Sequence, residues 1–171
     1  IGKVEGYTVF VKDALIGDTV KAKIMKAKKN YGYARLMEIV EASLDRVEPL
    51  CPCARQCGGC QIQALSYEKQ LEYKENKIRN NLQRIGGFSL EELSMEPIIG
   101  MEEPFYYRNK AQFPVGTDKE GHLVTGFYAG RTHSIIQNRK CYLGVEVNEK
   151  ILDAMIDYME ENHISAYDET S

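Results

Sequence analysis

Residues 18–26 read DTVKAKIMK, and the pattern of this stretch predicts a β-strand. Val20, Ala22 and Ile24 alternate along it with lysines and a methionine. A period of two residues is typical of a β-strand, because successive side chains point to opposite faces. We therefore predict a strand here with one face toward a core.

Two further strands are predicted on either side of it. Residues 5–11, EGYTVFV, precede this strand, and residues 30–40, NYGYARLMEIV, follow it after a basic link. Glycine and aspartate turns separate the three segments, which favours hairpin-like connections. The sequence thus predicts a small antiparallel β-barrel over residues 1–47.

The third predicted strand places Tyr31, Tyr33 and Arg35 on one face, because alternate residues of a strand point the same way. Aromatic and basic side chains on a small barrel are suited to stack bases and hold phosphates. The same residues also fit a simpler interpretation, since tyrosines favour strands and lysines keep sheet edges soluble. The pattern leaves both interpretations open.

A long amphipathic helix is predicted over residues 66–87, SYEKQLEYKENKIRNNLQRIGG. Ser66 is suited to cap it, Glu68 lies in the first turn, where a negative charge favours the dipole, and Gly86 ends it. One face is apolar at helical spacing. That stripe consists of Tyr67, Leu71, Ile78, Leu82 and Ile85.

The pattern returns to strands over residues 105–140. The expected strands are residues 105–115 (FYYRNKAQFPV), with a basic row on one face, 123–128 (LVTGFY) and 133–138 (HSIIQN). A second helix is expected from residue 148. Its apolar stripe consists of Ile151, Leu152, Met155, Ile156 and Met159. This order of elements predicts an α+β arrangement, an antiparallel sheet with packed helices.

Four of the five cysteines lie in residues 51–60, CPCARQCGGC. Cys57 and Cys60 form a C-x2-C pair, Cys51 precedes it at C-x5-C spacing, and Cys141 is far away in the chain. Four thiolates suit zinc or an iron–sulfur cluster. Because no second C-x2–4-C pair accompanies Cys141, the pattern favours [4Fe–4S], with zinc or inert buried thiols as alternatives.

Other residues of the cysteine region have secondary expected roles. Cys53 is off the ligand spacing and is expected to be a spare thiol. Arg55, Arg139 and Lys140 flank the expected ligands, which suits the net negative charge of a cluster held by four thiolates.

Several segments together resemble the 23S rRNA (uracil-5-)-methyltransferase family. CPCARQCGGCQIQALSYEKQLEYK at residues 51–74 resembles its iron–sulfur segment. VEGYTVFVKDALIGDTVKAKI at residues 4–24 and DRVEPLCP at residues 45–52 resemble a TRAM barrel leading into that segment, with a clipped start. FYYRNKAQFPV resembles a strand of the central domain. The resemblance implies a [4Fe–4S] cluster bound by Cys51, Cys57, Cys60 and Cys141.

The resemblance also implies a division of the chain. We expect a TRAM-like, OB-like RNA-binding barrel at residues 1–47, an iron–sulfur cysteine segment at 48–65, and a central α+β domain at 66–171. In this family, S-adenosylmethionine and the catalytic residues belong to a C-terminal Rossmann-like domain. We expect that domain to be absent from this chain, which then has no catalytic residue and is inactive alone. The cluster is expected to be a structural cross-link between the segment after the barrel and the central sheet.

The implied activity of the full-length protein is S-adenosylmethionine-dependent formation of 5-methyluridine in 23S rRNA, at a single-stranded or loop uridine. The expected RNA-binding residues are Lys26, Lys28, Lys29, Tyr31, Arg108, Lys110 and Arg131. No membrane and no obligate protein partner are expected, and the absence of a signal-peptide pattern indicates a cytoplasmic protein.

Two other classes of protein compete with this interpretation. One is a stand-alone RNA-binding module holding zinc or an iron–sulfur cluster, and the other is an electron-transfer module. Ferredoxins place their ligands in tighter C-x2-C-x2-C runs, which speaks against electron transfer. The net charge of −3 gives no overall basic signal, although positive charge predominates locally in residues 1–47 and 105–140.

Overall fold

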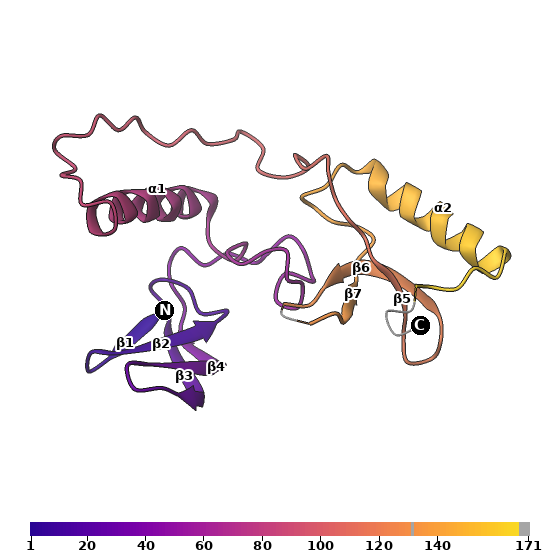
Figure 1. Cartoon of the computed structure of the whole chain (residues 1–171), viewed down its shortest axis with the longest axis horizontal. Coiled ribbons are helices and arrows are strands. Elements are labelled where there is room, and N and C mark those ends of the chain that lie inside the picture. The colour runs from indigo at the N-terminus through magenta and orange to yellow at the C-terminus, as the bar shows by residue number, and fades with distance from the viewer. Residues whose placement is uncertain (131, 168–171) are drawn as a thin grey trace. The chain divides into compact units, whose positions relative to one another are not determined.

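The computed structural model describes residues 1–130 and 132–167 (Figure 1). The chain divides into two compact units. The first unit consists of Ile1–Glu48 and Ile62–Gly100, and the second of Pro49–Gln61 and Met101–Ser171. The cysteine segment therefore packs with the second unit. The functional boundaries expected after residues 47 and 65 stay predictions.

A four-stranded sheet forms the first part of the first unit. Its strands are β1 (Gly2–Val4), β2 (Tyr7–Lys12), β3 (Thr19–Ala27) and β4 (Tyr31–Glu41), in the order β1-β2-β4-β3. The pairs β1–β2 and β3–β4 are antiparallel, whereas β2 and β4 are parallel. The result is a half-barrel sheet, which confirms the predicted all-β character of residues 1–47, but the purely antiparallel pairing expected for the small barrel was wrong. A parallel pair joins strands that are not consecutive, which local periodicity does not report.

The buried face predicted for residues 18–26 was also wrong. Val20 is half-buried, but Ala22 and Ile24 are exposed, Ile24 to 52%. The strand lies at the edge of the sheet, and its register with β4 shifts three times. Such bulges break the two-residue alternation, so the apolar positions do not form one continuous buried row.

The first helix, α1 (Tyr67–Arg84), confirms the predicted end signals. The Ser66 hydroxyl accepts a hydrogen bond from the Lys69 N–H at 3.4 Å, and Glu68 lies in the first turn. None of its residues is fully buried, so its apolar stripe is only partly covered. No helix in the described ranges is long and apolar enough to cross a membrane.

The second unit contains a three-stranded antiparallel sheet and a helix. The strands are β5 (Val115–Thr117), β6 (Leu123–Tyr128) and β7 (Ile135–Gln137), in that order, and α2 (Val147–Glu161) packs on β6. This confirms the predicted α+β arrangement. The buried side chains of this unit are Cys51, Cys57, Val124, Thr125, Leu152 and Ile156.

Two details of the second unit differ from the prediction. Residues 105–115 form no continuous strand, because only Val115 belongs to β5 and Arg108 makes one isolated bridge to Gly144. Pro114, which has no N–H to donate, precedes β5 directly. The buried part of the apolar stripe on α2 is narrower than predicted, because Ile151 is exposed.

Candidate metal centre and nucleic-acid interface

The four cysteines predicted as ligands gather in the second unit. Cys51 and Cys57 are buried, Cys60 and Cys141 are half-buried, and all four are free thiols. Burial, followed by the negative charges of Cys57, Cys141 and Cys51, raises the pKa of the Cys60 thiol to about 11. Burial also raises the pKa of Cys57, with Cys51 and Cys141 adding to it. Cys141 therefore lies within electrostatic reach of the distant cysteine segment.

This environment fits a metal or an iron–sulfur cluster. Buried thiols that repel one another when ionised hold their protons at neutral pH, unless a cationic centre compensates their negative charge. Metal binding requires thiolates and releases those protons. The cysteine set thus has the donor chemistry of zinc and iron–sulfur sites.

The end of β6 positions the C-x2-C pair. Cys57 makes an isolated antiparallel bridge to Ala129, and the Gly58 N–H donates to the Tyr128 carbonyl at 3.0 Å. A Cβ atom at position 58 would lie 2.9 Å from that carbonyl oxygen and 3.2 Å from the Cα of Gly130. Glycine is therefore required at this position by close backbone packing, a reason that the sequence alone did not supply.

N–H groups point at the sulfurs of Cys57 and Cys51, two of the predicted ligands. The Gly59 backbone N–H donates to the Cys57 Sγ at 3.3 Å, and the Asn138 side-chain amide donates to the Cys51 Sγ at 3.8 Å. Hydrogen bonds to sulfur stabilise the thiolate form and tune the potential of an iron–sulfur centre. Asn138 follows β7 directly and was not among the predicted residues.

Cys53 differs from the other cysteines of the segment. Its thiol donates to the Gln137 carbonyl oxygen at 3.7 Å. Its expected role as a spare thiol stays a prediction.

Arg108 adds positive charge to this region. Its N–H donates to the Leu143 carbonyl at 2.8 Å, so its backbone runs beside the chain that follows Cys141. The charge of Arg108 opposes the rise in the pKa of Cys60, which places its guanidinium within electrostatic reach of that thiol. The sequence indicated only an RNA-binding role for this residue, because nothing in the local pattern relates it to Cys60.

The flanking residue Arg139 has a different neighbour. Its Nη1 donates to the Asp153 carboxylate of α2 at 2.8 Å. Its Nε is buried and has no hydrogen-bond partner among the described residues.

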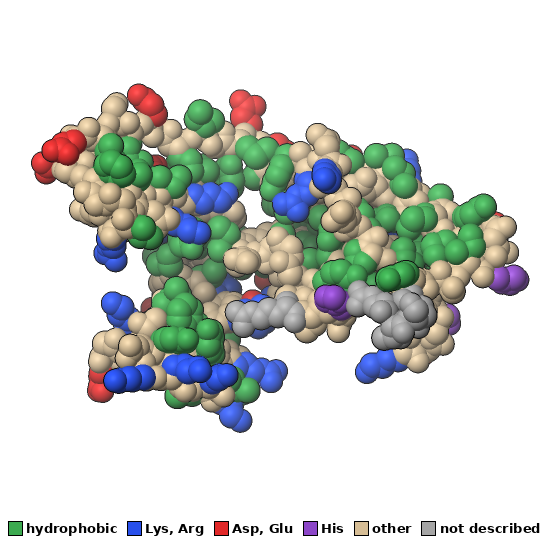
Figure 2. All heavy atoms as spheres, viewed as in Figure 1, with side chains coloured by type: hydrophobic (Ala, Val, Ile, Leu, Met, Phe, Trp, Pro, Cys, Tyr) green, Lys and Arg blue, Asp and Glu red, His purple; other side chains and the backbone are tan. Residues whose placement is uncertain are grey.

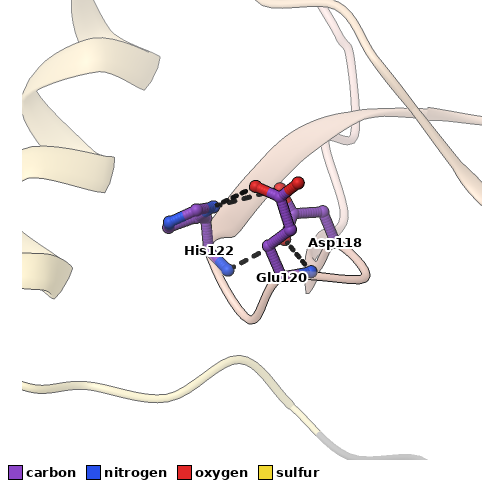
Figure 3. A group of neighbouring side chains, drawn as sticks. All are labelled: Asp118, Glu120 and His122. Carbon is purple, nitrogen blue, oxygen red and sulfur yellow. Dashed lines mark hydrogen bonds and ion pairs between the residues drawn. The ribbon is translucent and has the colours of Figure 1, made fainter.

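An exposed turn brings together Asp118, Glu120 and His122 (Figure 3). The Asp118 carboxylate accepts the N–H groups of Glu120 at 2.9 Å and His122 at 3.0 Å. These bonds are typical of an aspartate that closes a turn. The turn between β5 and β6 explains this grouping.

The residues expected to bind RNA in the first unit lie on and beside its sheet. Lys26, Lys28, Lys29 and Tyr31 are all exposed, and Lys28 and Lys29 form the β3–β4 turn. Figure 2 shows lysine and arginine side chains gathered over this unit, beside a hydrophobic area. The Tyr31 ring lies 5.8 Å from the ring of Phe10, which the prediction missed because it required the parallel β2–β4 pair.

The structure describes two of the three residues expected to bind RNA in the second unit. Arg108 and Lys110 are exposed in a stretch without a continuous strand. Arg131 lies outside the described residues.

This chain is similar to several known proteins. Residues 1–37 match the TRAM domain model. The chain is 46% identical over 99% of its length to an uncharacterized RNA methyltransferase of Halalkalibacterium halodurans, covering 36% of that protein. It is 43% identical over its full length to another from Clostridium acetobutylicum, covering 37%.

Among solved structures, the Pyrococcus abyssi tRNA (uracil-54, C5)-methyltransferase in complex with S-adenosyl-L-homocysteine has a similar fold. The TM-score is 0.65 at 24% identity, over 93% of this chain and 34% of that one. The chain thus spans about a third of the length of these relatives. It has a TRAM-type domain at residues 1–37 and is similar throughout to the N-terminal third of RNA methyltransferases.

Proposed function

We propose that this chain is the RNA-binding, cluster-bearing part of an S-adenosylmethionine-dependent methyltransferase that forms 5-methyluridine in 23S rRNA. The main support is the gathering of Cys51, Cys57, Cys60 and Cys141 in one unit of a chain that resembles the N-terminal third of RNA methyltransferases. The methyl donor and the catalytic residues belong, in this proposal, to a C-terminal domain of the full-length protein.

The proposed cofactor is a [4Fe–4S] cluster held by these four thiolates. Three ligands close together in sequence and one from afar fit such a cluster better than the paired C-x2–4-C motifs typical of structural zinc. When bound, the cluster supplies a rigid link between residues 49–61 and the chain after β7. Methyl transfer to a uracil carbon moves no net electron, so the proposed role is structural.

Metal analysis tests this cofactor. After anaerobic purification we expect about four iron and four sulfide per chain. Cys141→Ser should lose most of the iron, whereas Cys53→Ser should retain it. Zinc without sulfide, or equal iron in both variants, would contradict the proposed cluster or its fourth ligand.

A methylation assay tests the substrate. The full-length protein, supplied with S-adenosylmethionine, is expected to form 5-methyluridine in 23S rRNA and not in tRNA, as measured by mass spectrometry of nuclease digests. The 171-residue chain alone should transfer no methyl group. Methylation of tRNA alone would contradict the rRNA assignment, and no methylation of either RNA by the full-length protein would contradict the proposed activity.

A further inference from the structure

Three aromatic rings meet on one face of the four-stranded sheet. Phe10 of β2 lies 5.8 Å from Tyr31 and 5.5 Å from Tyr33, and the two tyrosine rings of β4 lie 5.7 Å apart, all between centroids. Each of these residues is 37% exposed. Mutual contact orders the rings, while their outer surfaces stay accessible to a planar ligand.

The parallel β2–β4 pair builds the centre of this face. Its register places Phe10 beside Tyr33 and Lys12 beside Arg35. Alternate residues of a strand share a face, so the aromatic and basic pairs lie on the same side of the sheet. The pairing of the two strands thus brings the aromatic side chains together and sets the basic ones beside each other.

Strand β3 adds two lysines to the same face. Its antiparallel register sets Lys23 opposite Arg35 and Lys26 opposite Tyr33. A spacing of three residues would normally turn these lysines to opposite faces. The register shift around Met25 places one extra residue between them, so both lysines lie on the aromatic side.

Three cations of this face are available to a negatively charged ligand. Lys23, Lys26 and Arg35 form no ion pair within the part of the chain that the structure describes. By contrast, Lys21 of the same strand pairs with Glu38 at 2.8 Å. The face therefore has an aromatic centre with a positively charged rim.

We propose that this face is a stacking platform for unpaired RNA bases, a role that rests on the RNA-binding function proposed above. The platform consists of Phe10, Tyr31 and Tyr33, rimmed by Lys12, Lys23, Lys26 and Arg35. Bases stack on the rings while the rim contacts phosphates. A duplex binds poorly, because its bases are stacked on one another and offer no free face.

Binding of a ten-nucleotide oligouridine to the anaerobically prepared 171-residue chain tests the platform. Phe10→Ala and Tyr33→Ala should each weaken binding by about 5- to 150-fold, the usual effect of removing one stacking ring. Tyr33→Phe should bind like the unaltered chain, because the ring remains. Tyr73→Ala is the matched control, since Tyr73 is 38% exposed on α1 of the same unit.

The inference is overturned if correctly folded Phe10→Ala and Tyr33→Ala chains bind oligouridine as tightly as the unaltered chain. It is equally overturned if a blunt RNA duplex of the same length binds as well as the single strand.

A fluorescent side chain tests the platform without removing an aromatic ring from it. The chain contains no tryptophan, so Tyr33→Trp introduces a single indole. Oligouridine should quench its emission by stacking, whereas Tyr73→Trp should not respond. Binding without quenching at position 33 overturns the proposal.

The rim is tested through salt dependence. Each phosphate contact on a single strand contributes about −0.7 to the slope of log affinity against log salt concentration. Lys23→Gln and Lys26→Gln should each reduce the slope by about that amount, and the α1 control Lys77→Gln should leave it unchanged. Equal slopes in all three variants contradict the proposed rim.

The binding experiments and the methylation assay test two different proposals, and either proposal can be contradicted without the other. Oligouridine stacking needs no methyl donor, so a full-length protein that methylates no uridine contradicts only the proposed enzyme. If that protein methylates 23S rRNA while the platform variants bind normally, only the platform is contradicted.

Discussion

Asp18 shows how one buried charge organises the first unit. Its side chain is fully buried in the β2–β3 turn and accepts hydrogen bonds from Arg46 Nε at 3.1 Å and from the N–H of Leu15 at 2.7 Å and Ser43 at 3.0 Å. Arg46, followed by these N–H groups, lowers the pKa of Asp18 from 3.8 to about 2 against the opposing effect of burial. The ionised carboxylate thus connects the turn to the chain after β4.

This pKa predicts acid sensitivity. Because the folded pKa lies below the unfolded one, the stabilisation is present above about pH 4 and is lost as the pH falls toward 2. We expect the free energy of unfolding of the first unit to decrease by about 2 kcal/mol over that window. Urea denaturation followed by circular dichroism at stepped pH measures it.

Two variants compare the effect on stability of a buried ion pair with that of an exposed one. Asp18→Asn should cost about 3 kcal/mol at neutral pH, because Arg46 is left without its anionic partner, and should flatten the acid profile. Glu38→Gln, which breaks an exposed pair with Lys21, should cost less than about 0.5 kcal/mol. An Asp18→Asn chain with the unaltered acid profile would refute this explanation.

Asn138 permits a second test at the level of one residue. Asn138→Leu removes the N–H that points at the Cys51 sulfur while keeping a similar volume. Hydrogen bonds to cluster sulfurs raise the reduction potential, so this variant should have a lower midpoint potential in an EPR-monitored titration. Asn80→Leu on α1 is the control. An unchanged potential in Asn138→Leu would show that this amide does not tune the centre.

At the level of elements, adjacent glycines of the cysteine segment have different surroundings. Gly58 contacts the backbone at the end of β6, whereas among the described residues a Cβ at Gly59 would meet the Cys57 sulfur alone, at 3.4 Å, an ordinary contact. Gly58→Ala should therefore push the segment away from β6, destabilise the second unit by about 1–3 kcal/mol and reduce iron retention. Gly59→Ala should have little effect.

Thermal unfolding and iron content of the two glycine variants, measured in parallel, check this prediction. Equal behaviour of the two would mean that the approach of Gly58 to β6 does not position the segment.

At the level of the whole molecule, the two compact units predict a local effect of the metal centre. All four proposed ligands belong to the second unit, whose core contains few fully buried side chains. Metal binding contributes directly to the folding free energy of such small units. Cys57→Ser should therefore accelerate amide hydrogen exchange in residues 49–61, β6 and β7, and leave the β2–β4 sheet protected.

Hydrogen exchange with mass spectrometry measures this prediction, and Cys53→Ser is the control. Faster exchange spread equally over both units, or no change in either, would contradict a cross-link confined to the second unit. Unchanged melting and RNA affinity of Cys57→Ser would refute a structural role for the cluster.

Local patterns predicted the elements whose formation depends on neighbouring residues. The Ser66 cap and the glycines after α1 delimited that helix, and the strand expected at residues 123–128 coincides with β6. The strand predicted at residues 105–115 does not form as one continuous strand. Alternation shows that a segment suits a strand, but it does not show that a partner strand pairs with it. The buried face of β3 failed for a related reason, since bulges interrupt its alternation at the sheet edge.

The candidate sites also contain some residues that the local sequence pattern predicted and others that only the tertiary structure brings there. Cysteine spacing indicated three ligands, because residues so close in the chain must be neighbours in space. The proximity of Cys141, the charge of Arg108 and the amide of Asn138 arise from contacts between distant segments, which no local pattern encodes. Likewise, alternation placed Tyr31, Tyr33 and Arg35 on one face of a strand. Phe10, Lys23 and Lys26 reach that face through a parallel pairing and a bulge that only the folded sheet creates.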